Sequence, residues 1–443
     1  MRERVLFSLF SFFLIVLLFQ PGALAAEKLS GELTYISLQG DIPSICMADL
    51  NTQSQRPLLT AENSNIRFES ITWSPNGEKF IYRKIISISL LKADYELWLS
   101  NKDGTEQVKL SARLAYSSTT SWSPDGEKVL FVQRDADKER IYVYNVITDD
   151  LKAIDIGEAE VEPDVSWSPD GRKILGVLKE KRRYGVFHVD IETQEVTILT
   201  ENRGFHSQAR WSPDGEKIVF VYRKPLTSMF GDKSGIYIMD TNGDNLRNLI
   251  EGENYTDLAW CPDSSFISYT KAEYSQADKK YYYGRFIYKI GKKSRPIMIE
   301  GGEKKFEDSS ILVWSPDGEK LAFREGFSVY VIFSGEKKPV KLRIPYAHGV
   351  PVWSPDSSLI ACAGYPSLLT NKSNIYVAPV DGSIIIKLTE DETHEYSPVW
   401  VPVTGNEVLD YPDEVLYYPD EVLDYPDEIL NHQDEVLDSP AGL

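Results

Sequence analysis

The stretch Ala209-Arg-Trp-Ser-Pro-Asp-Gly215, followed by Lys217-Ile-Val-Phe-Val-Tyr222, decides the fold of this chain. Its proline and aspartate suit the two central positions of a tight turn, and its glycine can adopt a positive φ. The residues after the turn alternate as they do in a strand, and two more short strands are predicted at 235–240 and 246–250. Short strands separated by turn residues predict an antiparallel meander.

Eight tryptophans begin near-copies of this phrase, at intervals of 39 to 54 residues. A period in the forties with strand-like content is typical of a β-propeller. Each indole is expected to pack between neighbouring blades, where its large apolar surface is buried. The tryptophans are Trp73, Trp122, Trp167, Trp211, Trp260, Trp314, Trp353 and Trp400.

The two ends of the repeat region each hold part of one blade. Residues 33–38, 44–50 and 57–60 match the second, third and fourth strands, and residues 396–400 match a first strand with nothing after it. We therefore predict an all-β propeller of eight four-stranded antiparallel blades, with the last blade shared by both termini. Seven blades remain the alternative, because one repeat spans only 39 residues.

The first 25 residues are predicted to be a cleaved signal peptide. Arg2 and Arg4 give a positive start, and Ala23-Leu-Ala25 is an A-x-A cleavage site. The apolar run from Val5 to Phe19 is shorter than the roughly 20 residues that span a bilayer. We expect a periplasmic or secreted protein, cleaved near Ala25, with no stable membrane insertion afterwards.

Charge and cysteine content exclude two classes of protein. The net charge is −19, which argues against a nucleic-acid partner. Residues 407–443 hold 12 acids and no Lys or Arg, so the rest of the chain carries −19 + 12 = −7. Three cysteines in an exported chain are not a disulfide framework, and Cys46, Cys261 and Cys362 are expected to act as small buried hydrophobes.

The predicted propeller covers residues 26–406, and an acidic tail of seven-residue repeats follows it at 407–443. The repeat reads Glu407-Val-Leu-Asp-Tyr-Pro-Asp413, and four of its five copies contain proline, which excludes a continuous helix. Low complexity and acidic composition predict extended disorder. The alternatives are a tandem Val-Leu ligand for a basic partner, a weak Ca²⁺ site, or a duplication without function.

The phrase Trp-Ser-Pro-Asp-Gly-x-Lys-Ile-x-Phe, followed by Ile-Tyr-Val-x-Asp and Leu-Thr, resembles the TolB-type propeller repeat, also called the WD40-like or PD40 repeat. The resemblance covers about residues 33–403. It implies a periplasmic protein that binds cell-envelope partners at the propeller mouth. True TolB has an α/β domain before its propeller and fewer blades. Here the first strand is predicted soon after the cleavage site, so membership of the Tol system is not implied.

The same repeats form the propeller of prolyl-oligopeptidase-like enzymes, which add an α/β-hydrolase domain with a Gly-x-Ser-x-Gly elbow. The sequence contains no such elbow, and its glycines lie in hairpin turns rather than in a phosphate-binding loop. We therefore expect a monomeric, non-enzymatic propeller without a cofactor that binds a protein or other ligand of the cell envelope. The alternative is a carbohydrate-active propeller similar to a polysaccharide lyase.

Propeller ligands generally bind where the first strands converge, so residues three to six positions before each tryptophan are candidates to line the channel mouth. These residues are mostly polar or acidic, and they include three of the five histidines. The candidates are Glu69, Glu162, Asp164, His206, Gln208, Tyr255, Asp257, Asp308, His348, His394 and Glu395.

Three interpretations of these residues stay open. They can simply face solvent at the starts of strands, or they can form a recognition mouth for a peptide, glycan or protein. In the third interpretation His206, His348 and His394, with Gln208 or a carboxylate, hold Mn²⁺ or Zn²⁺. The sequence has no paired metal-ligand motif such as HxH or HExxH, so no metal is expected.

Overall fold

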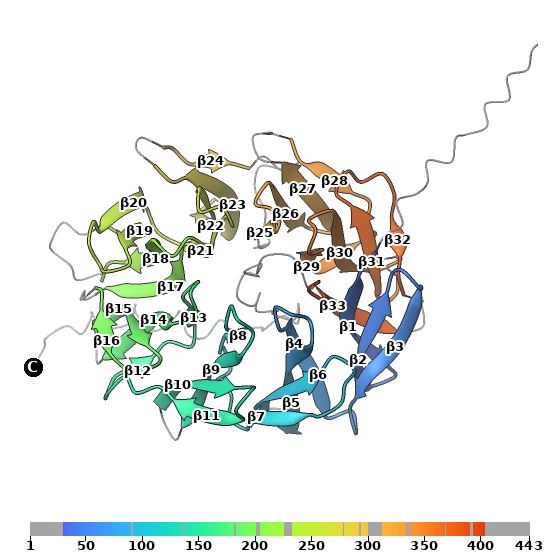
Figure 1. Ribbon diagram of the computed structural model, residues 1–443. Coiled ribbons are helices and arrows are strands. Elements are labelled where there is room, and N and C mark those ends of the chain that lie inside the picture. The colour runs from blue at the N-terminus through green and yellow to red at the C-terminus, as the bar shows by residue number, and fades with distance from the viewer. Residues whose placement is uncertain are drawn as a thin grey trace, which may run out of the picture.

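The computed structural model describes residues 30–403 except 90–91, 136–137, 181–182, 201–203, 226–232, 278, 292–293, 300–311, 334–335, 337, 368 and 390–392. Within these residues the chain folds into eight antiparallel sheets arranged around a common axis (Figure 1). This confirms the all-β propeller of eight blades and excludes the alternative of seven. The predicted signal peptide and the acidic tail lie outside the described residues.

In each blade the first strand lies nearest the axis and ends at the repeated tryptophan (Figure 1). The first strands of blades 1 to 8 are β4 (Ile66–Trp73), β8 (Thr120–Trp122), β12 (Glu160–Val161) with β13 (Ser166–Trp167), β17 (Phe205–Trp211), β21 (Tyr255–Trp260), β25 (Val313–Trp314), β29 (Ala347–Trp353) and β33 (His394–Trp400). The second strands, in the same order, are β5 (Lys79–Ser89), β9 (Lys128–Asp135), β14 (Lys173–Glu180), β18 (Lys217–Arg223), β22 (Phe266–Ser275), β26 (Lys320–Glu325), β30 (Leu359–Gly364) and β1 (Glu32–Gln39).

The third and fourth strands lie progressively farther from the axis. The third strands are β6 (Lys92–Asn101), β10 (Lys138–Asn145), β15 (Arg183–Asp190), β19 (Gly235–Asp240), β23 (Lys280–Lys289), β27 (Ser328–Phe333), β31 (Asn374–Pro379) and β2 (Ile42–Asp49). The fourth strands are β7 (Val108–Ser111), β11 (Asp150–Ala153), β16 (Val196–Ile198), β20 (Arg247–Glu251), β24 (Ile297–Met298), β28 (Val340–Leu342), β32 (Ile386–Lys387) and β3 (Ser54–Thr60).

Blade 8 closes the ring with strands from both ends of the described chain. Strand β33 pairs antiparallel with β1, so that Trp400 lies opposite Leu33 and His394 lies opposite Leu38. The sheet order β3-β2-β1-β33 confirms that the termini share one blade, as the partial repeats predict. Closure therefore depends on strand pairing and packing, and the three cysteines are free.

Six of the eight tryptophans donate a hydrogen bond from Nε1 to the preceding blade, whereas Trp167 Nε1 and Trp211 Nε1 have no partner among the described residues. All eight indoles are buried, with between 1% and 9% of their surface exposed. Trp122 Nε1 donates to the Thr72 carbonyl at 3.1 Å, and Trp400 Nε1 donates to the Val352 carbonyl at 3.3 Å. Each acceptor is the residue just before the preceding tryptophan. The repeat therefore encodes a link between blades as well as apolar burial.

At two seams a hydroxyl replaces that carbonyl as the acceptor. Trp73 Nε1 donates to Thr34 Oγ1 at 3.1 Å, and Thr34 in turn donates to the Val399 carbonyl at 3.3 Å. Trp314 Nε1 donates to Ser268 Oγ at 3.0 Å. The hydrogen bonds through Thr34 therefore connect Trp73 of blade 1 to both β1 and β33 of blade 8, the blade in which the two ends of the described chain meet.

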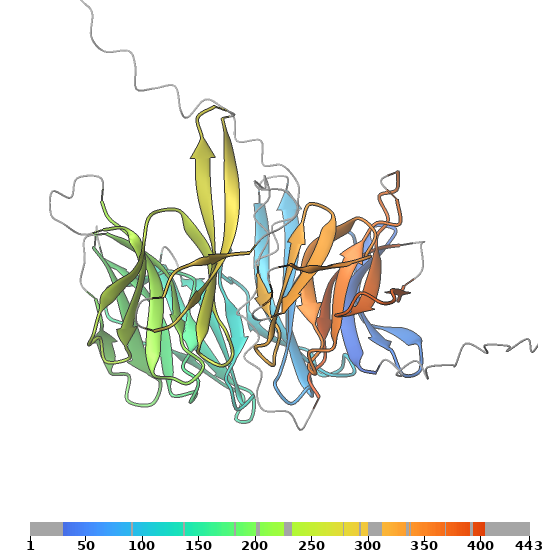
Figure 2. The ribbon, with the colours of Figure 1, turned by 90° about the horizontal axis from the view of Figure 1, so that it is seen from above.

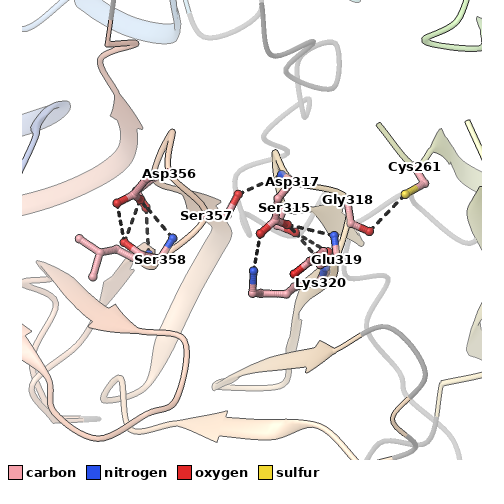
Figure 3. Close-up of polar contacts among 11 residues, drawn as sticks. Cys261, Ser315, Asp317, Gly318, Glu319, Lys320, Asp356, Ser357 and Ser358 are labelled. Carbon is pink, nitrogen blue, oxygen red and sulfur yellow. Dashed lines mark hydrogen bonds and ion pairs between the residues drawn. The ribbon is translucent and has the colours of Figure 1, made fainter. Parts of the chain in front are cut away.

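The Ser-Pro-Asp turns, which directly follow the tryptophans, form a second set of contacts between blades at the same end of the first strands. In the turn after Trp314, Ser315 Oγ donates to Asp317 Oδ1 at 2.5 Å (Figure 3). The Asp317 amide donates to Ser357 Oγ in the next blade at 3.0 Å. Ser357 occupies the glycine position of its own turn at φ 60°, so the serine that breaks the repeat adds a contact between blades.

Two glycines allow a test of the contact between the turn after Trp73 and the segment that follows β33. Gly77 has φ +69°, and a Cβ there would lie 2.6 Å from the Pro402 carbonyl oxygen. Gly40 has φ +65° and no atom within 4 Å of such a Cβ. In urea unfolding, Gly40→Ala is expected to cost about 1 kcal/mol from backbone strain alone. Gly77→Ala should cost clearly more, because the segment after β33 must also move; equal costs would contradict this contact.

Candidate functional site

The first strands begin on one face of the ring, here called the mouth face, and reach their tryptophans at the opposite face, here called the turn face. Four of them contain a residue with positive φ three positions before the tryptophan: Ser70, Gln208, Asp257 and Ser397. The strand register shifts at these points. Such β-bulges turn side chains away from strict alternation, and they lie among the residues predicted to line the mouth.

Two of the predicted mouth residues fasten one blade to the next. Asp164 accepts from Arg210 Nη1 through both carboxylate oxygens at 2.9 Å, which joins blade 3 to blade 4. Gln208 donates to the Tyr255 carbonyl at 3.3 Å and accepts from the Leu258 amide at 2.9 Å, which joins blade 4 to blade 5. Both side chains therefore have structural partners in the neighbouring blade.

Two predicted histidines meet at the seam between blades 7 and 8. The rings of His348 and His394 are stacked, with centroids 6.0 Å apart, and Tyr365 stacks on His348 at 4.5 Å. His394 Nδ1 shares a hydrogen bond with Ser373 Oγ at 2.8 Å, whereas His348 Nε2 is buried without a partner. Burial lowers the pKa of His348 to about 4, with help from His394 and Arg324, so its imidazole is neutral at pH 7.

His206 lies apart from this pair, within blade 4. Its ring packs against Phe220 and Tyr222, with centroids 5.4 and 5.2 Å away. Its Nε2 is 3.3 Å from Thr200 Oγ1, and burial lowers its pKa to about 4. The three histidines of the metal hypothesis therefore do not form one cluster. Across the described part of the chain, no three His, Cys, Asp or Glu side chains are grouped to hold a metal ion.

Two further candidates are buried. The Tyr255 hydroxyl donates to the Glu251 carbonyl at 2.9 Å, and its ring packs edge-on against Tyr269. Glu395, adjacent to His394 in β33, is 4% exposed and accepts from Thr393 Oγ1 at 2.7 Å. Burial raises the pKa of Glu395. Successive residues of a strand face opposite sides, so His394 and Glu395 do not share one surface.

Three acidic candidates remain half-buried near the starts of first strands. Glu162 follows β12, Glu69 lies in β4, and Asp257 lies in β21 and accepts from Thr256 at 3.0 Å. Burial raises the pKa of both glutamates; Lys179 opposes this effect at Glu162, and Arg83 opposes it at Glu69. Among the described residues, neither glutamate side chain has a hydrogen-bond partner. Asp308, the remaining candidate, lies outside the described residues.

Sequence reasoning missed a group beside Glu69 at the seam between blades 1 and 2. Arg83 lies directly opposite Glu69 in the β4–β5 register and donates through Nη2 to the Tyr116 carbonyl at 2.6 Å. Its guanidinium lies 5.8 Å from the Tyr95 ring, and Tyr95 packs edge-on against Tyr116 at 5.3 Å. Tyr116 is 61% exposed. The available signal was a pair of adjacent charged residues, Arg83 and Lys84, within the otherwise apolar stretch 80–86 of the second strand.

This arrangement is suited to recognising a polar ligand. Half-buried carboxylates from blades 1 and 3 can accept hydrogen bonds, and the exposed Tyr116 ring offers an apolar surface with a polar tip. Arg83 is 3% exposed, and its Nε atom has no partner, so it also retains an unused donor. Such side chains bind and orient a ligand.

Comparisons with known proteins agree with the fold. Residues 84–281 match the family described as the TolB beta propeller domain, PD40. A stretch of 111 residues is 34% identical to the uncharacterized peptidase YuxL of Bacillus subtilis strain 168, covering 24% of this chain and 16% of that protein. The match thus spans a small part of that relative.

Two solved structures of oligogalacturonate lyase are also similar. One, in complex with manganese, has a TM-score of 0.53 at 14% identity, covering 79% of this chain and 98% of that chain. The other, from Vibrio parahaemolyticus, has a TM-score of 0.52 at 15% identity, covering 79% and 97%. At these identities the likeness shows a shared fold alone.

Proposed function

From the premise that this chain is a β-propeller of the TolB (PD40) type, we propose that it is an exported, non-enzymatic protein that binds a cell-envelope partner at its mouth face. Export is inferred from the positive start, short apolar run and A-x-A site of residues 1–25. In the described part of the chain, no helix is long and apolar enough to cross a membrane.

The observation that carries the binding proposal is the pair of half-buried glutamates, Glu69 and Glu162. Neighbouring polar side chains such as Asp164 and Gln208 make contacts between blades, whereas these two carboxylates have no hydrogen-bond partner in the described residues. A carboxylate that is partly removed from water without a donor is costly. A ligand that supplies donors would remove that cost, so these groups favour binding.

Capture from the cell envelope tests this proposal. The tagged protein is expected to retain a specific partner that is lost from a Glu162→Gln, Tyr116→Ala variant. The matched control is Glu216→Gln, Ile147→Ala, which changes one exposed acid and one exposed apolar residue on the turn face. Equal thermal unfolding of both variants would show that the fold is intact. Capture that survives the mouth substitutions, or is lost equally in the control, would exclude the mouth as the binding site.

The carbohydrate-lyase alternative predicts a different result. A lyase acting on a polyuronate releases unsaturated sugars that absorb ultraviolet light. Because His206 lies apart from His348 and His394, we expect no increase in ultraviolet absorbance when the protein is incubated with polygalacturonate and Mn²⁺. An increase that is lost in a His348→Ala variant would overturn the non-enzymatic proposal.

A further inference from the structure

Blade 5 carries a long hairpin that projects beyond the rest of the ring. Strands β22 and β23 have ten residues each and extend past the neighbouring blades (Figure 2). The inner strand β21 pairs with β22 only as far as Lys271, and the outer strand β24 pairs with β23 only at Phe286 and Ile287. The outer half of the hairpin is therefore a two-stranded ribbon standing on the mouth side.

This hairpin is basic in a strongly acidic protein. From Phe266 to Met298 the sequence has 8 Lys or Arg and 2 Asp or Glu, a net charge of 8 − 2 = +6, against −19 for the whole chain. Lys279 and Lys280 are exposed at the tip, and Lys271 is half-buried nearer the base, where it pairs with Glu273 at 2.7 Å. One positive region thus stands out from the surrounding negative charge.

Between these charges the hairpin has an apolar, aromatic groove. Its volume is about 310 Å³. Gly284 lets the Phe286 ring lie directly against the backbone of β23, because a Cβ there would lie 2.8 Å from that ring. At the base of the groove Met298 is 46% exposed. The lining residues are Lys271, Glu273, Tyr274, Ser275, Tyr282, Tyr283, Gly284, Phe286 and Met298.

We propose that this groove is the docking site for the acidic repeats at residues 407–443 of the same chain. The first three repeats each place Val-Leu and Tyr-Pro between carboxylates, as in Glu421-Val-Leu-Asp-Tyr-Pro-Asp427. The hairpin offers the complementary order, with lysines at the tip and near the base and aromatic residues between them. Proline-containing segments dock readily on aromatic-lined grooves, and opposite charges favour this pairing.

The length of one extended repeat is also similar to the length of the hairpin strand along which it would lie. Seven extended residues span roughly 23–25 Å, and the strand from Lys280 to Phe286 spans roughly 20 Å. Val403, the last described residue, follows the end of β33 in blade 8, which is three blades from the hairpin around the ring. Residues 407–443 have a contour length of roughly 120–130 Å when extended, which allows one repeat to reach around the rim of the ring.

Hydrogen exchange of the full chain, compared with a chain ended after Asn406, tests this inference. We expect the amides of residues 280–286 to exchange more slowly in the full chain, and about 0.5 M salt to remove the difference. Identical exchange in both proteins would overturn the proposal. Protection that grows with protein concentration would also overturn docking within one chain, because it would place the tail of a second copy in the groove.

A peptide titration distinguishes the tail from other acidic occupants. The peptide Glu414–Asp427 should bind the shortened protein, and Lys279→Glu, Lys280→Glu should weaken binding by about tenfold or more. The matched control is Lys224→Glu, Lys372→Glu, two exposed lysines outside the hairpin, which should have little effect. Equal binding of a scrambled peptide, or binding of polygalacturonate but not of the repeat peptide, would overturn the tail as the specific occupant.

Discussion

Ending the chain after Thr393 is expected to abolish the single cooperative unfolding transition of the propeller. This change removes β33, so β1 keeps only β2 as a partner and blade 8 becomes a three-stranded sheet with an open inner edge. It also removes Trp400, which is 1% exposed and packs with Leu33 of blade 8 and Ala361 of blade 7. The loss of this indole alone is expected to cost roughly 3–5 kcal/mol.

The matched control is a chain ended after Asn406, which keeps β33 and removes only the acidic repeats. In about 0.5 M salt, which is expected to release the repeats from the hairpin, its free energy of unfolding in urea should equal that of the full chain within about 0.5 kcal/mol. A point substitution separates closure from simple loss of packing. Trp122→Ala removes a comparable indole from a blade whose strands are consecutive in the sequence. Trp400→Ala should additionally speed amide exchange in β1 and β33, and equal exchange in both variants would contradict closure by this strand.

Lowering the pH from 7 to 5 is expected to destabilise the propeller by about 2 kcal/mol for each of His206 and His348. Burial lowers the pKa of both imidazoles to about 4, whereas an unfolded histidine titrates near 6.5. Between these values the unfolded chain binds protons that the folded chain does not. The stability from these neutral histidines is therefore present above pH 6.5 and is lost as the pH falls toward 4.

Three buried or half-buried glutamates affect the pH dependence of stability in the opposite direction. Burial raises the pKa of Glu69, Glu162 and Glu395. Because the folded state favours the neutral acids, their contribution to the free energy of unfolding is present below pH 4.5. It is lost as the pH rises through their folded-state pKa values. The two effects oppose each other in the weakly acidic range. Single histidine variants are therefore a sharper test than the pH profile of the unmodified protein.

Urea unfolding of His348→Gln at pH 7 and pH 5 makes that test. Glutamine does not titrate, so the difference in unfolding free energy between the two pH values should shrink by about 2 kcal/mol. His206→Gln should behave similarly, because its ring is also buried and neutral. An unchanged difference in both variants would mean that neither histidine resists protonation in the folded state.

Several features of the fold follow directly from short-range sequence patterns. The strands predicted at 33–38 and 235–240 correspond to β1 and β19, and the turn after Trp211 forms where its proline and aspartate predict it. Such features are predictable because turn conformation and strand alternation depend on nearby residues. The partial blades at the two ends also predicted correctly which strands pair to close the ring.

The site was less predictable, because its side chains depend on partners in other blades. Gln208 is at a bulge with φ 52° and contacts Leu258, which lies 50 residues away. Counting positions before a tryptophan cannot reveal that bulge or that partner. The same count placed Glu395 beside His394 at the mouth, although adjacent strand residues face opposite sides. It also overlooked Arg83, which reaches the seam from a second strand.

The repeated tryptophan and turn predicted the ring of blades, and the partial repeats at the two ends predicted the closing sheet that the termini share. Both could be predicted from the sequence because turns and strands are determined mainly by neighbouring residues. Which polar groups fasten blades together, and which stay available to a ligand, was decided only when the blades packed. Asp164 meets Arg210 across one seam, while Glu162, two residues earlier, has no such partner among the described residues. That difference arises from side chains that are distant in sequence and adjacent only in the closed ring.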